Sequence, residues 1–146
     1  MCGIAGICSL QETVAPRIIQ EMLNTLVHRG GDDERYLALD FEGDQTYPLT
    51  GSRSKTKGPR IEEFTRSAHL FLGHRRLSII DLSSADHQPM SNGDGSLWIV
   101  YNGEIYNYLE IREELKTLRH CFRSWTDTEV ILHAYEAWGI EYLRQA

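Results

Sequence analysis

Residues 1–9 read MCGIAGICS, and this small, apolar stretch decides how the rest of the chain is interpreted. Cys2 is preceded only by Met1, a start residue that is usually removed when the next side chain is small. Residues 3–9 predict a buried strand that begins directly after the cysteine. Removal of Met1 would therefore leave, ahead of that strand, a cysteine with a thiol and an unblocked α-amine on one carbon.

An N-terminal cysteine carries its own general base. An α-amine has a pKa of about 7.7–8.0, so a large part of it is neutral near neutral pH. It can take the thiol proton directly or through one water, as the amine does in threonine-based hydrolases. The other interpretation is that Cys2 is a small apolar residue of the core. The remaining sequence distinguishes a nucleophile from a packing residue.

The composition is that of one globular domain. The chain has 146 residues, of which 41% are hydrophobic, enough for a sizeable core. Its net charge of −6 disfavours nucleic acid or an anionic membrane as a partner. The sequence has no apolar run of membrane-spanning length and no pattern of a secretory signal at its start. These features predict a soluble, cytoplasmic protein.

The cysteines and histidines show no familiar spacing. Cys2, Cys8 and Cys121 are odd in number and irregularly placed, which does not indicate a disulfide framework. The histidines form no HExxH motif, and no cysteine pair has zinc-finger spacing. The sequence therefore predicts reduced thiols, no metal site and no cofactor in this chain.

Local patterns in the first half predict mixed structure. Pro16 suits the first turn of a helix, which continues at helical spacing until a glycine pair stops it. Residues 40–66 are rich in Gly, Pro, Thr, Ser and charge, and predict a long loop or insertion with little structure. Two short strands are expected at 68–72 and 77–80, on either side of 73–76.

The second half predicts a turn, a strand and two helices. NGDG at 92–95 is a turn signal, and 97–101 is interpreted as a central strand. Asn107 is expected to cap one helix and Thr126 another, the second ending at Gly139. Strands joined by both tight turns and helices predict a layered α+β fold.

Polar residues that could carry chemistry gather at three further places. Adjacent arginines at 75 and 76 form either a salt-bridged rim or a fork that grips a substrate carboxylate. YNGE at 101–104 is either an ordinary Asn-Gly turn or a carboxamide and an N–H that hold an oxyanion. Asp127 either favours the N-terminus of its helix or pairs with an ammonium group. With a nucleophilic thiol, these groups suit hydrolysis of the glutamine side-chain amide.

The stretch MCGIAGI resembles the start of class II glutamine amidotransferases, the N-terminal-nucleophile hydrolase group. Further segments follow in the order expected of glutamine-hydrolysing asparagine synthetases, up to about residue 139. They are HRGGDDE at 28–34, GHRRLSIIDL at 73–82, HQPM at 87–90, VYNGEIYN at 100–107 and TDTEVIL at 126–132. The resemblance implies a four-layer α-β-β-α sandwich that is incomplete at its C-terminus.

The resemblance also implies roles for individual residues. Cys2 would be the nucleophile, with its freed α-amine as the base, and Asn102 and Gly103 would form the oxyanion hole. Arg76 would bind the carboxylate of glutamine, and Asp127 its α-amine. The remaining residues implied to line the glutamine pocket are Leu77, Ser78, Ile79, Ile80 and Glu104.

The sequence departs from the family pattern at three places. Gly31 stands where the family usually has proline, and Trp125 where we expect a smaller or more polar residue, so that Trp125 either covers the pocket or packs outside it. The stretch 40–66 is also longer than the family's usual link.

Residues 1–146 are expected to be part of a type 2 glutamine amidotransferase domain. The synthetase domain that activates aspartate with ATP and Mg²⁺ is expected to be absent, because the sequence has no ATP-binding motif. The implied partners are glutamine and a synthetase domain in the same or another chain, and a homo-oligomer stays open. Two alternatives also stay open: an amidotransferase with another acceptor, and a non-catalytic remnant that acts as a binding or regulatory module.

Overall fold

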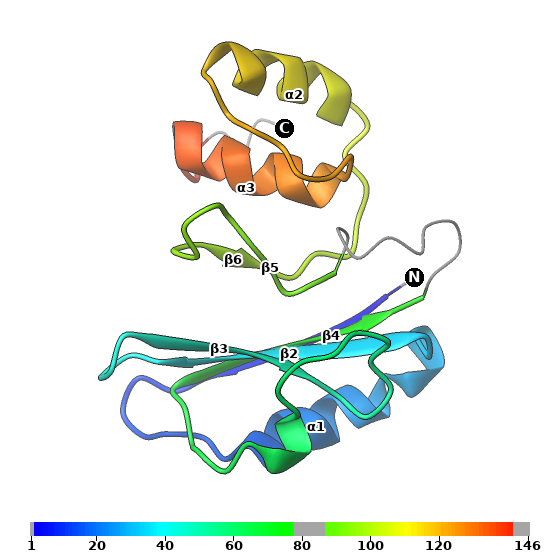
Figure 1. The fold of residues 1–146 in the computed structure, drawn as a ribbon, viewed down its shortest axis with the longest axis vertical. Coiled ribbons are helices and arrows are strands. Elements are labelled where there is room, and N and C mark those ends of the chain that lie inside the picture. Colours follow the sequence, from blue (N-terminus) through cyan, green and yellow to red (C-terminus); the bar gives the residue numbers. More distant parts are fainter. Residues whose placement is uncertain (1, 78–86, 142–146) are drawn as a thin grey trace. The chain divides into compact units, whose positions relative to one another are not determined.

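The computed structural model describes residues 2–77 and 87–141 (Figure 1). They divide into two compact units, within Met1–Pro89 and Met90–Ala146. Each unit has its own cluster of buried apolar residues.

The first unit is built on a four-stranded antiparallel sheet. In spatial order the strands are β1 (Gly3–Cys8), β4 (Leu70–Arg76), β2 (Asp33–Asp40) and β3 (Gln45–Thr50). Gly3 lies opposite Arg75, and Asp33 opposite Arg76. The amino ends of β1 and β2 therefore meet the carboxyl end of β4 at one end of the sheet.

Helix α1 (Pro16–Thr25) covers one face of this sheet (Figure 1). Ile19 and Leu23 lie one turn apart on the helix and are fully buried, and burying each such side chain stabilises the fold by about 1.5–3 kcal/mol. Gly73 in β4 allows the close approach of the helix, because a Cβ there would lie 3.1 Å from Leu23 Cδ2. The other buried residues of this core are Tyr36, Ala38, Leu49, Ile61, Ala68 and Phe71.

Within residues 90–141, the second unit has one short strand pair and two helices. Strand β5 (Met90–Ser91) pairs with β6 (Trp98–Ile99), on either side of the turn predicted at 92–95. Helices α2 (Tyr108–Thr117) and α3 (Asp127–Trp138) pack against each other (Figure 1). Their buried apolar contact consists of Ile111, Leu115, Val130 and Ala134.

Several predictions from local pattern are confirmed, including the α+β class, a strand directly after Cys2 and a helix that starts at Pro16. The first strand is not buried as predicted, because Ile4, Gly6 and Cys8 are exposed. The helix ends at Thr25, before the glycine pair that was expected to stop it.

Thr126 caps α3, because its Oγ1 accepts a hydrogen bond of 3.3 Å from Glu129 N. Gly139 ends the helix with φ at 72°, in the left-handed region that favours glycine. These features depend on neighbours only a few residues away in the sequence.

The strand predictions need correction where pairing is non-local. Strand β4 begins at Leu70 and continues through 73–76, where a break between two strands was expected. Of the second expected strand, 77–80, residues 78–80 lie outside the described residues.

The stretch 40–66 contains β3 and the 3-10 turn η2 (Ile61–Glu63), so the prediction of little structure is wrong. Pro48 is tolerated in β3 because this strand lies at the edge of the described sheet. The strand expected at 97–101 shortens to Trp98–Ile99 and pairs only with β5 among the described strands.

Asn107 directly precedes α2, but its side chain makes no capping hydrogen bond, so the predicted side-chain cap is wrong. Its φ and ψ, −98° and 21°, differ from the extended conformation that a capping residue usually has. Among the described residues, no helix combines the length and the apolar character needed to cross a bilayer.

Candidate active site

Cys2 lies at the end of the sheet where β1 and β4 run side by side. Because Gly3 pairs with Arg75 in antiparallel register, the next residues, Cys2 and Arg76, lie at the same end of neighbouring strands. Cys2 is partly exposed. Its carbonyl oxygen accepts a hydrogen bond of 3.2 Å from Arg29 Nε. The predicted nucleophile and the predicted carboxylate-binding arginine therefore belong to one rigid scaffold.

The segment at 28–34 packs against the carboxyl end of β4. Gly30 fits so closely that a Cβ there would lie 2.8 Å from both Arg75 O and Arg76 C. Asp32 N donates a hydrogen bond of 3.1 Å to Arg76 O. A Cβ at Gly31, by contrast, would meet no atom within 4 Å. Of the two glycines, only Gly30 is required by close packing.

The two adjacent arginines have different surroundings. Arg75 is 1% exposed, and its Nη2 lies 2.6 Å from Glu34 Oε2. Its Nε also donates to Leu23 O at 2.8 Å, which ties β4 to α1. Successive strand residues point to opposite faces, and Arg76 is partly exposed on the other face. Arg75 is therefore structural, while Arg76 is accessible to a ligand.

Leu77 and His87 flank the stretch that contains Ser78, Ile79 and Ile80, which lie outside the described residues. Leu77 follows β4 directly and is 41% exposed. His87 Nδ1 lies 3.0 Å from Asp33 Oδ2, at the beginning of β2. Since Asp33 pairs with Arg76, both flanking residues lie at the end of the sheet that carries Cys2.

Asp33 and His74 are buried titratable groups that sequence reasoning did not single out. Burial opposes ionisation of Asp33, but hydrogen bonds from His87 and Ser54 and the charge of Arg35 outweigh it and lower the pKa of this carboxyl. Burial, and then the charge of Arg76, lowers the pKa of His74 to about 4. His74 is therefore neutral at pH 7. The sequence signal that could have found them is their place in two recognised segments: Asp33 lies in HRGGDDE at 28–34, and His74 lies in GHRRLSIIDL at 73–82.

In the second unit, Asn102, Gly103 and Glu104 lie exposed on the loop before α2. Asp127, the first residue of α3, holds this loop, because its Oδ2 accepts a hydrogen bond of 3.1 Å from Ile105 N. The contact links two segments that are far apart in the sequence and both predicted to bind glutamine. A Cβ at Gly103 would lie 2.5 Å from the Tyr101 hydroxyl, so a larger residue there would require the Tyr101 side chain to shift.

A cavity of about 410 Å³ opens between this loop and the start of α3. Trp125 lines it and is 73% exposed, so the unexpected tryptophan forms part of the cavity wall. The Arg112 guanidinium stacks on the Trp125 ring at 4.6 Å from its centroid. The residues that line the cavity are Gly103, Glu104, Ile105, Tyr106, Tyr108, Trp125 and Asp127.

The sequence-predicted site thus draws on both units. Cys2, Arg76 and Leu77 share one end of the first unit's sheet. Gly103, Glu104 and Asp127 share one cavity of the second unit, and Asn102 precedes Gly103 on the same loop. Arg29, which holds the Cys2 carbonyl, was missed as an individual residue, although its segment had been recognised.

Comparison with known proteins agrees with the resemblance seen in the sequence. A glutamine amidotransferase domain family matches residues 39–146, more than half of the chain. Asparagine synthetase (glutamine-hydrolysing) 1 of Bacillus subtilis is 34% identical over 139 residues, which cover 92% of this chain and 17% of the relative. Asparagine synthetase (glutamine-hydrolysing) 2 of the same organism is 35% identical over 150 residues, 98% of this chain and 16% of the relative.

A relative that is named for a different reaction is equally similar. The glutamine–fructose-6-phosphate aminotransferase (isomerising) of Sulfolobus acidocaldarius is 36% identical over 143 residues, 93% of this chain and 23% of the relative. The chain spans less than a quarter of the length of these three relatives. It belongs to the glutamine amidotransferase domain family.

Proposed function

We propose that this chain hydrolyses the side-chain amide of glutamine to glutamate and ammonia, with Cys2 as the nucleophile. The observation that carries the proposal is the position of Cys2 beside the end of β4 that bears Arg76, with its carbonyl held by Arg29. A thiol held at the same end of a sheet as a guanidinium suits attack on a substrate that is anchored through its carboxylate.

Removal of Met1 would free the α-amine of Cys2 to act as the base. The amine takes the thiol proton, and the sulfur attacks the amide carbon of glutamine. The Asn102 carboxamide and the Gly103 N–H stabilise the negative charge on the carbonyl oxygen. The proton then passes to the leaving nitrogen, ammonia departs and a thioester remains. Water, deprotonated by the same amine, attacks the thioester, so that glutamate leaves and the thiol is restored.

Two charged side chains would hold the amino-acid end of glutamine. Arg76 binds the α-carboxylate with its planar fork, and Asp127 pairs with the α-ammonium group. The partial exposure of Arg76 and the position of Asp127 in a cavity wall support these roles. Glu104, Leu77, and the backbone of Ser78, Ile79 and Ile80 would line the rest of the pocket.

We further propose that residues 1–146 form part of a four-layer α-β-β-α sandwich. The sheet of the first unit with α1 on one face supports one α layer and one β layer. Residues 1–146 would then be a type 2 glutamine amidotransferase domain that supplies ammonia to a synthetase domain. Since no disulfide joins Cys2, Cys8 and Cys121 in the described structure, we place the reaction in the cytoplasm.

The favoured fate of the ammonia is asparagine synthesis from aspartate and ATP on that synthetase domain, with ATP and Mg²⁺ bound there. The similarity to two asparagine synthetases supports this choice. A second candidate is transfer to another acceptor, which the similar aminotransferase that is named for fructose-6-phosphate supports.

The direct test compares two cysteine variants of the purified chain. Cys2→Ala should abolish release of glutamate and ammonia from glutamine, while Cys8→Ala should leave it unchanged, because Cys8 lies at the other end of β1. The intact mass of the active protein should lack Met1, since a retained methionine blocks the amine. Equal loss of activity in both variants would mean structural damage and would contradict the proposed role of Cys2.

A further inference from the structure

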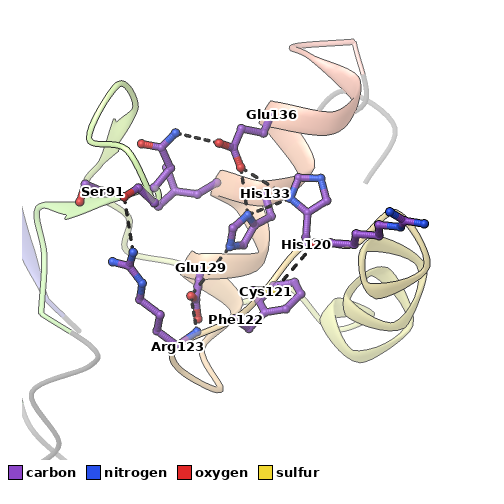
Figure 2. Close-up of a pocket in the computed structure, with 12 residues that line it drawn as sticks. Ser91, His120, Cys121, Phe122, Arg123, Glu129, His133 and Glu136 are labelled. Carbon is purple, nitrogen blue, oxygen red and sulfur yellow. Dashed lines mark hydrogen bonds and ion pairs between the residues drawn. The ribbon is translucent and has the colours of Figure 1, made fainter.

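A second cavity, of about 550 Å³, lies in the second unit beside α3. Figure 2 shows that the side chains of His120, His133 and Glu136 converge there. His120 follows α2, whereas His133 and Glu136 lie one turn apart on the same face of α3. The cluster is therefore assembled from two segments of the chain, in a cavity that a small ligand can enter.

The three donor atoms have the spacing of metal ligands. His133 Nδ1 lies 3.0 Å from His120 Nδ1 and 3.0 Å from Glu136 Oε2. His120 Nδ1 lies 3.6 Å from Glu136 Oε2, so the three atoms form a nearly equilateral triangle. Ligands at about 2.0–2.1 Å from a tetrahedral zinc ion are about 3.3 Å apart. An ion near the centre of this triangle would lie within bonding reach of all three atoms.

With neutral imidazoles, hydrogen bonds cannot fully satisfy His120 Nδ1, His133 Nδ1 and Glu136 Oε2 at the same time. A neutral imidazole carries at most one proton on Nδ1, so it either donates or accepts there. If His120 Nδ1 donates to His133 Nδ1, the His133 lone pair cannot also bond the Glu136 carboxylate. If His133 Nδ1 donates to Glu136, its contact with His120 is at best a shared, three-centre bond. A cation satisfies all three lone pairs at once.

Neighbouring groups hold two of the three ligands in place. Asn92 Nδ2 donates a hydrogen bond of 2.8 Å to Glu136 Oε1, which directs the other oxygen at the histidines. Asn92 is only 4% exposed. On the far side of its ring, His133 Nε2 lies 3.9 Å from Glu129 Oε1. A carboxylate behind a histidine and a hydrogen bond on a ligating carboxylate are the usual outer partners of metal ligands.

We propose that His120 Nδ1, His133 Nδ1 and Glu136 Oε2 bind a divalent transition-metal ion of the zinc class. Two imidazoles and one carboxylate favour zinc over magnesium or calcium, which prefer oxygen ligands. With three protein ligands, the fourth position of a tetrahedral ion would be left for a water. The sequence predicted no metal, because His120 and His133 are 13 residues apart on separate elements and match no known motif.

The ion would fasten the segment between α2 and α3 to the middle of α3. That segment continues through Trp125 to Thr126, the residue that caps α3. Binding would therefore stabilise the second unit against unfolding. All three tryptophans of the chain, Trp98, Trp125 and Trp138, belong to this unit, so their fluorescence reports on it alone.

The test is titration of the full chain with Zn²⁺ and with Co²⁺ after chelator treatment. We expect one ion per chain, a tetrahedral Co²⁺ absorption spectrum and a higher midpoint of thermal unfolding by tryptophan fluorescence. His120→Gln and Glu136→Gln should each weaken binding by more than about 100-fold, since changes to outer partners alone cost about 10–100-fold. Asn92→Ala, which removes an outer partner of Glu136, should weaken binding by about 10–100-fold.

Controls separate this site from adventitious binding. His69→Gln removes a histidine that also has a carboxylate neighbour, with Nδ1 3.1 Å from Asp40 Oδ1, and should leave affinity unchanged. Cys121→Ser, in the same cavity wall, should also keep the Co²⁺ spectrum. Circular dichroism of each variant without metal checks folding. Unchanged affinity in His120→Gln and Glu136→Gln, or a spectrum lost in Cys121→Ser, would overturn the proposal.

Discussion

The two units differ in whether the polar groups near the predicted site residues are buried or exposed. In the first, Glu34 and Arg75 form an ion pair inside the protein, and Glu34 also accepts hydrogen bonds from Ser52 Oγ and Arg53 N. In the second, the predicted catalytic residues lie on an exposed loop that Asp127 holds through one backbone N–H. The first unit thus fixes the backbone next to the predicted nucleophile, and the second presents the predicted oxyanion groups on an exposed loop. Variants of the buried ion pair in the first unit should lose stability, and variants of the exposed loop in the second should lose turnover.

The largest expected effect is on the buried pair. Arg75→Met leaves the Glu34 carboxylate buried without its partner and should destabilise the protein by about 3–5 kcal/mol. The double variant with Glu34→Gln removes both charges and should recover much of that loss. Denaturant unfolding followed by circular dichroism gives both values. Arg76→Met should change stability by less than about 0.5 kcal/mol, because its side chain is partly exposed. Equal destabilisation by Arg75→Met and Arg76→Met would contradict the distinction between the two arginines.

The next effect concerns the exposed loop. Asn102→Ala should lower kcat for glutamine hydrolysis by about 10²–10³-fold, the usual cost of one oxyanion donor, and leave the unfolding midpoint unchanged. Steady-state rates and thermal unfolding of the same preparation measure the two quantities. Asn107→Ala, on the same loop, is the matched control and should keep its activity. A loss of stability that accounts for the lost rate in Asn102→Ala would assign the residue a structural role.

A smaller effect distinguishes two neighbouring glycines. Gly30→Ala places a methyl group against the backbone of β4 and should cost about 1–3 kcal/mol, as overpacking does. Gly31→Ala has open space and should change stability by less than about 0.5 kcal/mol. Urea unfolding curves provide the comparison. If both variants unfold at the same urea concentration, the close contact of Gly30 with β4 is not present in solution.

The last comparison concerns how the stability of the second unit depends on pH. Burial raises the pKa of Glu129, but hydrogen bonds from His133, Arg123 N and Ser124 outweigh it and hold this pKa at about 2, against 4.5 for an unperturbed glutamate. A lowered pKa stabilises the fold above the unfolded value and ceases to do so as pH falls through the folded value. Tryptophan fluorescence should therefore show the second unit losing stability between about pH 4.5 and 2. Glu129→Gln should remove that dependence, and an unchanged acid profile in this variant would contradict the assignment.

Patterns of neighbouring residues predicted much of this fold, whereas elements that depend on distant partners were not predicted. Cys2, Pro16 and Thr126 carry information in their immediate neighbours, so the first strand and two helices were found. Strand β2 was missed because it begins with the charged residues Asp33, Glu34 and Arg35, which do not resemble a buried strand. Their burial depends on partners such as Arg75, about forty residues away, that appear only once the chain has folded.

The candidate site shows the same division. The order of the segments along the chain predicted roles for Arg76, Gly103 and Asp127 through the family resemblance. The resemblance assigned the carboxylate role to Arg76 rather than Arg75, but only the structure shows Arg75 buried and Arg76 partly exposed on the opposite face of β4. The contact of Arg29 with the Cys2 carbonyl joins residues 27 positions apart, so it could be found only from the three-dimensional structure. The cluster of His120, His133 and Glu136 was invisible for the same reason.

The central claim is that the sulfur of Cys2 attacks glutamine while its own α-amine takes the proton. Its most direct test is to trap the enzyme with an electrophilic glutamine analogue and to map the modified residue by mass spectrometry. We predict one label per chain, on a cysteine that has become the first residue after loss of Met1. A label on Cys8 or Cys121, or undiminished hydrolysis by protein that retains Met1, would contradict this account.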